Sequence, residues 1–191
     1  MNENSTTSPL SVCLFCGSSE GKDPQHSQTA ERFGLSCAKN GVRLVYGGGG
    51  IGLMGIAARA AMAAGGEVIG VLPEFLEKLE VGLREITDLI IVDSMHARKK
   101  KMYDLSDAFV VLPGGVGTLD ETIEMITWAQ LSHHTKPIII VDGNGYWQKF
   151  VELLAHVIEE GFAPSHTADI YTVISHIDHA LPTIRELVQG T

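Results

Sequence analysis

The segment LPGGVGTLDE, residues 112–121, holds the residue types that point most directly to chemistry. It follows the apolar run DAFVVL, so we expect a strand that leads through a tight turn into a helix. Three glycines leave bare backbone where the chain turns and can approach a ligand: Gly114, Gly115 and Gly117. Thr118 is predicted to open the helix, whose free N–H groups and positive dipole end favour an anion. The segment therefore predicts a phosphate cradle, with the Glu121 carboxylate just inside the helix.

Helix capping is the alternative interpretation of part of this segment. Thr118 and Glu121 have the spacing of a capping box, in which each side chain satisfies a free N–H group of the first helical turn. Capping alone does not require Pro113 and three closely spaced glycines. It also does not explain why Glu121 shares a helical face with Met125 and Trp128. We therefore favour the phosphate cradle.

Two more loops rich in small residues follow the first two predicted strands. They read CGSSEG and YGGGGIGLMG, and such runs are typical of backbone that faces a ligand. With the first glycine of the PGG segment, they supply the phosphate-loop candidates Gly17, Ser18, Gly48, Gly49 and Gly114. Three such loops at one sheet edge favour a compact phosphorylated sugar or a mononucleotide as ligand.

A dinucleotide site is the alternative for the second loop. Gly50, Gly52 and Gly55 match GxGxxG, and Glu74 lies near the end of the next predicted strand. The usual dinucleotide fingerprint follows the first strand of the fold, however, whereas this one follows the second. We therefore rank the dinucleotide site second.

A basic helix is predicted in the segment VDSMHARKKKMYDL. Ser94 can cap it, and one apolar stripe of the helix holds Met95, Arg98, Met102 and Leu105. Burying a guanidinium is costly unless it meets a carboxylate or a phosphate, so Arg98 is a candidate site residue, with a structural ion pair as the alternative. Lys100 is predicted to face solvent. His96 either contacts a ligand or lies at the surface.

The cysteines and histidines do not have the spacing of a metal site. Cys13 and Cys16 form a CxxC inside a predicted strand, where they point to opposite faces and favour core packing over redox or metal chemistry. His133 and His134 follow a predicted helix end, with no second ligand pair at metal spacing. We predict no metal and no cofactor.

Short apolar runs alternate with helical patterns, which is typical of an α/β fold with a doubly wound, mainly parallel sheet. The expected strands are Ser11–Cys16, Arg43–Tyr46, Glu67–Val71, Leu89–Val92, Ala108–Leu112, Pro137–Val141 and Tyr171–Ile174. The expected helices are Pro24–Lys39, Leu53–Ala64, Met95–Leu105, Thr118–Leu131, Tyr146–Glu160 and Ile177–Val188. In such folds ligands bind beyond the carboxyl ends of the strands, where the strand order reverses. The site is therefore expected in the strand-to-helix loops.

Composition narrows the class of protein. The 191 residues, 45% of them hydrophobic, suffice for one buried core, so we predict a disordered tail at residues 1–9 and a single domain at residues 10–191. A net charge of −9 argues against nucleic-acid binding. The apolar runs are far shorter than the roughly 20 residues of a membrane helix, and no signal peptide is visible. An odd number of cysteines favours a reducing, cytoplasmic setting over a disulfide framework.

Several segments together resemble the LOG family, the cytokinin riboside 5′-monophosphate phosphoribohydrolases. The segments are CGSS at residues 16–19, YGGGGIGLMG at 46–55, SMHARK at 94–99, PGGVGTLDE at 113–121 and ITWAQL at 126–131. The resemblance implies a Rossmann-like fold, usually in a homodimer. It also implies hydrolysis of the N-glycosidic bond of adenine-type nucleoside monophosphates to free base and ribose 5-phosphate. Relatives are often labelled lysine decarboxylases, but nothing in the sequence supports a pyridoxal phosphate site.

The resemblance also implies site residues, with Arg98 and Glu121 as the catalytic pair. The implied substrate-contacting positions are Glu80, Arg98, Lys99, Gly115, Val116, Gly117, Thr118, Leu119, Asp120, Glu121 and Thr127. Many bacterial relatives look as though they carry a histidine shortly after the glutamate matched by Glu80, where this chain has Leu83. The resemblance therefore predicts phosphate binding more specifically than it predicts which base is selected.

A mechanism follows from these residues. The glycine loop and the helix end would hold the 5′-phosphate, and Arg98 and Lys99 would add charge, so that remote binding energy orients the ribose. Glu121, which the helix end should keep ionised, would stabilise the positive charge at the anomeric carbon and position water. The residues alone do not identify the proton donor to the base, and the resemblance implies Glu80 and Arg98 as the two options. The alternatives are a non-catalytic carrier similar to molybdenum-cofactor carrier proteins and a dinucleotide-dependent oxidoreductase.

The helix after the PGG loop also predicts an assembly. Its apolar residues surround more than one face, and they are Leu119, Ile123, Met125, Ile126 and Trp128. A helix that is apolar on more than one side must be buried on more than one side. The sheet covers one side, so we expect the same helix of a second subunit, related by a two-fold axis, to cover another.

Overall fold

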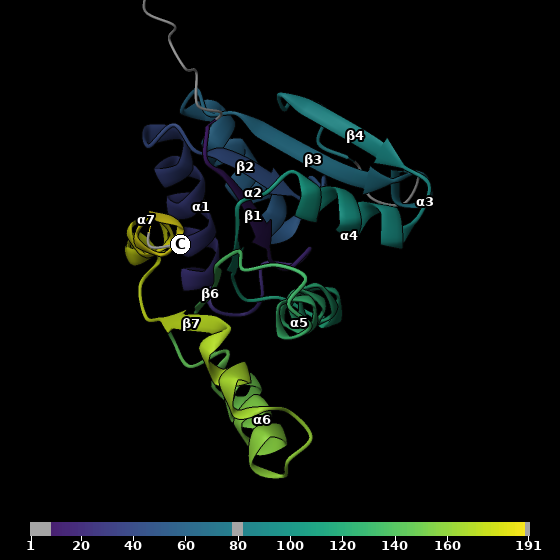
Figure 1. The fold of residues 1–191 in the computed structure, drawn as a ribbon. Helices are drawn as coiled ribbons and strands as arrows, with labels where there is room; N and C mark the ends of the chain where they lie inside the picture. The colour runs from purple at the N-terminus through teal and green to yellow at the C-terminus, as the bar shows by residue number, and fades with distance from the viewer. Residues whose placement is uncertain (1–8, 78–81, 190–191) are drawn as a thin grey trace, which may run out of the picture.

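The computed structural model describes residues 9–77 and 82–189. Within these ranges one sheet has the strand order β4-β3-β2-β1-β5-β6-β7, and each neighbouring pair is parallel (Figure 1). The strands are β1 (Ser11–Phe15), β2 (Arg43–Tyr46), β3 (Val68–Pro73), β4 (Asp88–Val92), β5 (Ala108–Val111), β6 (Ile138–Val141) and β7 (Tyr171–Ile174). The order reverses between β1 and β5. The predicted α/β fold with a doubly wound parallel sheet is therefore confirmed.

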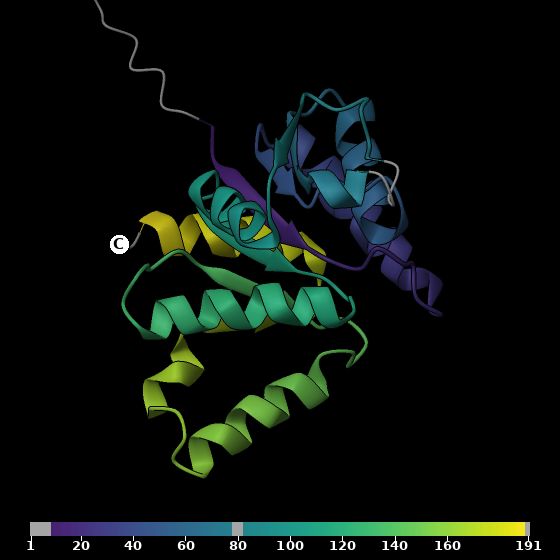
Figure 2. The same cartoon turned by 90° about the vertical axis from the view of Figure 1, so that its right-hand side faces the viewer.

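Helices cover both faces of the sheet. They are α1 (Pro24–Lys39), α2 (Gly52–Ala63), α3 (Glu74–Glu77), α4 (Met95–Asp104), α5 (Val116–Gln130), α6 (Gln148–Glu159) and α7 (Ala180–Gln189). Side chains of α1, α2 and α7 form one hydrophobic core with the sheet, and side chains of α4, α5 and α6 form the other. Figure 2 looks onto the second face, where α4 and α5 lie in front of the strands. No helix among the described residues has the length and apolar character to cross a bilayer.

Local sequence signals account for the ends of α1. The Asp23 carboxylate accepts a hydrogen bond from the Gln25 amide, and Pro24 occupies the first turn. Gly41 follows the helix with φ of +64°, a conformation that suits glycine. The predicted bounds of α1 are confirmed.

The two cores divide the CxxC residues as the sequence predicts. Cys13 belongs to the core under α4 and α5, whereas Cys16 belongs to the core under α1 and α2. Both are buried free thiols. Their side chains therefore lie on opposite faces of the sheet.

Some element bounds were predicted wrongly. Strand β3 extends beyond Val71 to Pro73, because its last residues pair with the end of β4. Helix α6 begins at Gln148 rather than Tyr146, because the Asp142 carboxylate accepts a hydrogen bond from the Trp147 amide and holds the preceding residues in a turn. The one-turn helix α3 was not predicted, since a turn this short leaves no periodic pattern.

A close contact between α1 and α2 gives a test of the packing. A Cβ atom at Gly34 would overlap the carbonyl oxygen of Ala57. Gly34→Ala must therefore push the helices apart, and overpacking of this kind costs about 1–3 kcal/mol. Urea unfolding should show this loss for Gly34→Ala, while Glu31→Ala, at an exposed position of α1, should leave stability nearly unchanged. Equal stability of the two variants would contradict the close approach of the helices.

Candidate active site

A cavity of about 230 Å³ lies at the carboxyl edge of the sheet, where the strand order reverses between β1 and β5. Its wall combines the loop after β1, the starts of α2 and α5, and side chains from α3 and α4. The lining residues are Cys16, Gly17, Ser18, Met54, Leu76, Arg98, Gly115, Val116, Gly117, Thr118 and Glu121. The site was expected at this reversal.

The PGG loop forms one wall by close backbone packing. The Gly17 amide donates a 3.0 Å hydrogen bond to the Pro113 carbonyl, which joins the loops after β1 and β5. A Cβ atom at Gly114 would overlap the Thr118 hydroxyl and lie 2.9 Å from the Gly17 nitrogen. Gly114 is thus required for packing between the two loops. Cβ atoms at Gly115 and Gly117 would instead meet open space.

The capping interpretation of this helix is wrong. Helix α5 begins at Val116, two residues before the predicted start, and its N-cap is Gly115 in extended conformation. No side chain among the described residues caps it. Thr118 therefore lies inside the first turn, where its hydroxyl cannot act as an N-cap. The open end of α5 adjoins the cavity and keeps its capacity to bind an anion.

Arg98 is buried at the back of the cavity, as its place on the apolar stripe of α4 predicts. Its Nε donates to the Val71 carbonyl at 3.2 Å, and its Nη2 donates to the Gly47 carbonyl at 2.9 Å. The remaining nitrogen, Nη1, lies 3.9 Å from a Glu121 carboxylate oxygen. Two backbone carbonyls, one within β3 and one directly after β2, thus hold the guanidinium, which also faces a buried carboxylate.

Glu121 reaches the same cavity from α5, and only 8% of the residue is exposed. Burial raises the pKa of Glu121 to about 7, although the Arg98 guanidinium opposes the shift. The expectation that the helix end keeps Glu121 ionised is therefore wrong. Glu121 lies beyond the first turn of α5, where the helix dipole is weak, so desolvation dominates.

Lys99 pairs with two carboxylates of α5. Its Nζ lies 3.0 Å from Asp120 and 3.1 Å from Glu124. Burial lowers the pKa of Lys99, but hydrogen bonds and ion pairs to both carboxylates outweigh it and leave the pKa raised. Glu124 was missed by the sequence reasoning, although it follows Asp120 at the i,i+4 spacing that places both on one helical face.

The other predicted site residues divide by location. Leu119 is half-buried against the core under α4 and α5, and Thr127 is exposed, with its hydroxyl donating to the Ile123 carbonyl. Neither lines the cavity of Arg98 and Glu121. Glu80 lies outside the described residues.

The second glycine loop mainly packs against other parts of the chain. A Cβ atom at Gly48 would lie 3.0 Å from the Leu72 side chain, and Gly49 forms a bridge to Gly82. Gly52, with φ of +59°, approaches the Ser18 backbone. The structure therefore does not bring Gly48 and Gly49 into the cavity, and internal packing accounts for these glycines.

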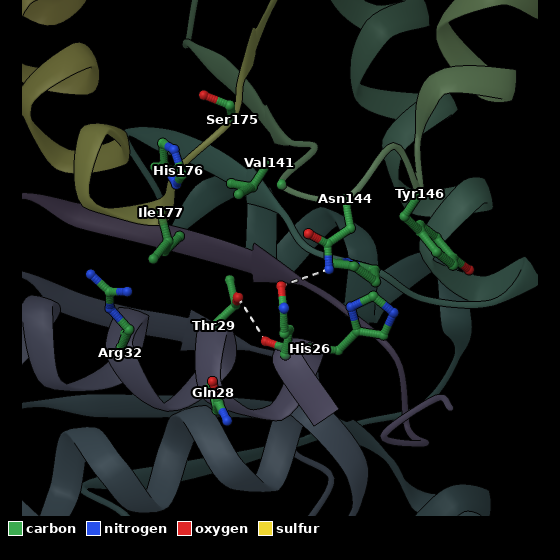
Figure 3. Close-up of a pocket in the computed structure, with 13 residues that line it drawn as sticks. His26, Gln28, Thr29, Arg32, Val141, Asn144, Tyr146, Ser175, His176 and Ile177 are labelled. Carbon is green, nitrogen blue, oxygen red and sulfur yellow. Dashed lines mark hydrogen bonds between the residues drawn. The ribbon is translucent and has the colours of Figure 1, made fainter. Parts of the chain in front are cut away.

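Two neighbouring cavities continue along the carboxyl edge of the sheet. One of about 500 Å³ shares Gly17, Ser18 and Gly115 with the first cavity and is closed on its far side by His26 and Tyr146. A smaller one, shown in Figure 3, lies between α1 and the loops after β6 and β7, beyond the same two aromatic residues. The largest cavity is not the best candidate, because only the first one holds a buried arginine and a buried carboxyl group.

Comparisons with known proteins show what this chain is similar to. A family model described as possible lysine decarboxylase matches residues 54–184. The cytokinin riboside 5′-monophosphate phosphoribohydrolase of Rhodococcoides fascians is 40% identical over 178 residues, 93% of this chain and 90% of that protein. The enzyme LOG4 of Arabidopsis thaliana, with the same activity in its name, is also 40% identical, over 93% of this chain and 80% of that protein.

Among solved structures, the molybdenum cofactor binding protein of Rippkaea orientalis matches with a TM-score of 0.71. Its identity is 22%, over 96% of this chain and 99% of that chain, so the likeness shows the fold alone.

The glycine loop and open helix end at the reversal of a parallel sheet define a Rossmann-like α/β protein. With the family match and the identity of about 40%, the chain belongs to the LOG family, whose model carries the description possible lysine decarboxylase.

The raised pKa of Glu121 predicts a pH-dependent effect on stability. Between the ordinary carboxyl pKa and about 7 the folded state holds a proton that the unfolded state releases, so stability falls as pH rises through this window. Glu121→Gln never ionises. Its Tm should therefore exceed that of the wild type at pH 8 by on the order of 5 °C, but by much less at pH 4.5. Calorimetry at both pH values checks this, and an equal difference at both would contradict the raised pKa.

Proposed function

We propose that this protein hydrolyses the N-glycosidic bond of adenine-type nucleoside 5′-monophosphates to free base and ribose 5-phosphate. The observation that carries the proposal is the buried pair of Arg98 and Glu121 beside the open N-terminus of α5. The relatives named cytokinin riboside 5′-monophosphate phosphoribohydrolases support it. Because these relatives align over most of the chain, their activity is a strong guide to the substrate class.

The phosphate end of the substrate fits the start of α5. Free N–H groups at Val116, Gly117 and Thr118 and the positive helix dipole favour an anion there. Phosphate binding then orients the ribose, so binding energy from a remote group contributes to turnover. The charge of Lys99 is already neutralised by Asp120 and Glu124. We therefore propose that Lys99 holds α4 and α5 together and does not bind the phosphate directly.

The reaction needs a negative group near the anomeric carbon. As the bond between C1′ and the base nitrogen breaks, its electron pair leaves with the base and positive charge builds at C1′. Ionised Glu121 stabilises that charge and accepts a proton from the water whose oxygen bonds to C1′. A pKa near 7 suits a group that must accept and later release a proton at neutral pH.

The leaving base also needs a hydrogen bond or a proton. Two nitrogens of Arg98 are bonded to backbone carbonyls, whereas Nη1 donates to the Met95 sulfur at 3.9 Å, which is a weak acceptor. Nη1 is therefore the nitrogen of the guanidinium that a substrate can engage most readily. The adjoining cavity of about 500 Å³ gives room beyond the pair for a larger ligand.

The alternatives explain fewer observations. Pyridoxal phosphate chemistry needs a Schiff-base lysine, and among the described residues no lysine lines the cavity of Arg98 and Glu121. A dinucleotide site would use Gly50, Gly52 and Gly55, but a Cβ atom at Gly52 or Gly55 would overlap other backbone of the protein. A non-catalytic carrier of a phosphorylated ligand would not need the buried Glu121.

We also propose a homodimer. Helix α5 exposes apolar side chains at Val116 and Ile123, and Leu131, which caps the end of the helix, is exposed on the same side. On α6, Leu153 is also exposed. The same helix of a second copy across a two-fold axis would cover this surface. Trp128 is not the best probe of such an interface, because it packs within its own chain against Tyr103, with ring centroids 5.1 Å apart.

A reducing, cytoplasmic setting completes the proposal. The cysteines Cys13, Cys16 and Cys37 are buried free thiols, which a reducing compartment maintains.

The activity can be tested by chromatography of the free base after incubation with AMP, N6-isopentenyl-AMP or adenosine. We expect both monophosphates to be cleaved, and adenosine to be a poor substrate because it lacks the group that the start of α5 binds. Glu121→Gln should retain nucleotide binding while turnover falls on the order of 100-fold or more. Lys100→Ala is the control, since Lys100 lies at the surface and pairs with Asp104. Binding of AMP without release of adenine would instead favour a carrier.

The assembly can be tested by light scattering. Ile123→Glu places a charge in the exposed apolar face of α5 and should shift the protein toward monomers. Gln28→Glu adds a charge on α1, on the other face of the sheet, and should leave the mass unchanged. A monomeric wild type would refute the dimer.

A further inference from the structure

Gly47 begins the run of four glycines after β2, and its nearest neighbour is a site residue. A Cβ atom at Gly47 would overlap Nη2 of Arg98, and would lie 3.0 Å from Cζ of the same guanidinium and 3.2 Å from Sδ of Met54. Gly47 is not part of the cavity wall. Its lack of a side chain therefore makes room for Arg98 rather than for a ligand.

Gly47 also holds the guanidinium through its backbone. Its carbonyl accepts the 2.9 Å hydrogen bond from Nη2 of Arg98, and the Val71 carbonyl accepts from Nε. The guanidinium is planar and its donors form a rigid fork, so two fixed bonds determine the orientation of the third nitrogen. This third nitrogen, Nη1, lies 3.9 Å from Glu121.

A side chain at position 47 would act on Arg98 more than on the fold. The atoms that it would displace first belong to the far end of a flexible side chain, and Gly47 does not have a positive φ, so its backbone accepts alanine. The added methyl group would push Nη2 from the Gly47 carbonyl and turn Nη1 away from its present place.

We propose that Gly47 is a positioning residue for the reaction, because its missing side chain and its carbonyl together set the orientation of Arg98 toward Glu121. The proposal rests on the proposed function, because it concerns the rate of that reaction. The orientation of Arg98 toward Glu121, however, can be measured without turnover. The matched control is Gly143→Ala. Gly143 closely follows the end of β6, its added Cβ atom would lie 3.2 Å from the Ser175 carbonyl oxygen, and it has no contact with Arg98.

The experiment is a double-mutant cycle with Gly47→Ala, Arg98→Ala and the double variant, using kcat/KM for AMP and the Tm of each protein. Gly47→Ala should lower kcat/KM by on the order of 10-fold to 100-fold, as for a misplaced catalytic group. Its Tm should fall by no more than several degrees, because one hydrogen bond of a buried charge is lost while the rest of the fold is kept. In the Arg98→Ala background it should lower kcat/KM by less than about 2-fold, since the two changes act through one group. An equal loss in both backgrounds would overturn the proposal.

A second measurement separates this proposal from the proposed function. The Glu121 carboxyl group is titrated by NMR in the wild type, Gly47→Ala and Gly143→Ala. Arg98 and Lys99 lower the pKa of Glu121, whereas burial, Asp120 and Glu124 raise it. Turning the guanidinium away should therefore raise the pKa in Gly47→Ala only. A wild type without hydrolase activity would refute the function and leave this result to decide the proposal, and an unchanged pKa would refute the positioning role.

Discussion

The burial of a guanidinium at the end of the sheet is the constraint on which the site depends. A charged group removed from water needs hydrogen-bond partners, and Arg98 finds two of them in backbone carbonyls rather than in a second side chain. These carbonyls belong to Val71 of β3 and to Gly47, directly after β2. The backbone of β3 and of the residue that follows β2 therefore sets the position of the arginine. The proposed catalytic pair depends on this backbone geometry.

The charges around the pair follow from two successive residues of α4. Adjacent residues of a helix point in different directions, so Arg98 faces the strand ends while Lys99 faces α5. Lys99 holds α5 through Asp120 and Glu124, and this fixes the helix that carries Glu121. The carboxylates that anchor α5 also raise the pKa of Glu121, in addition to the larger effect of burial. The contacts that position Glu121 therefore also raise its pKa.

The sequence correctly predicted the features that depend on a single helix or strand. Periodicity predicted the strands and the longer helices, and the apolar stripe of α4 predicted that Arg98 is buried. The start of α5 was misplaced because the spacing of Thr118 and Glu121 imitates a capping box, and the helix starts earlier, after the extended Gly115. The dipole argument then gave the wrong direction for the pKa of Glu121, since its desolvation arises from the packing of several elements.

Glycines show the limit of such prediction most clearly. Gly114 and Gly47 both lie in glycine-rich loops after a strand, and in the sequence they look alike. The first lets the loops after β1 and β5 pack together, whereas the second makes room for a side chain 51 residues further along the chain. Only the folded structure shows which neighbour each glycine accommodates. A run of glycines therefore predicts close approach but not the partner.

The fold and the buried side chains differ in how strongly they support a particular function. The molybdenum cofactor binding protein shares the fold at 22% identity, and a fold by itself is compatible with more than one function. An open helix end binds an anion whether or not a bond is later broken. A buried carboxyl group with a pKa of about 7 beside an arginine is different, because it makes the empty protein less stable at high pH. A group that costs stability and is not needed to hold the anion is best explained by the chemistry it performs. Glu121 therefore favours a hydrolase more strongly than the glycine loops do.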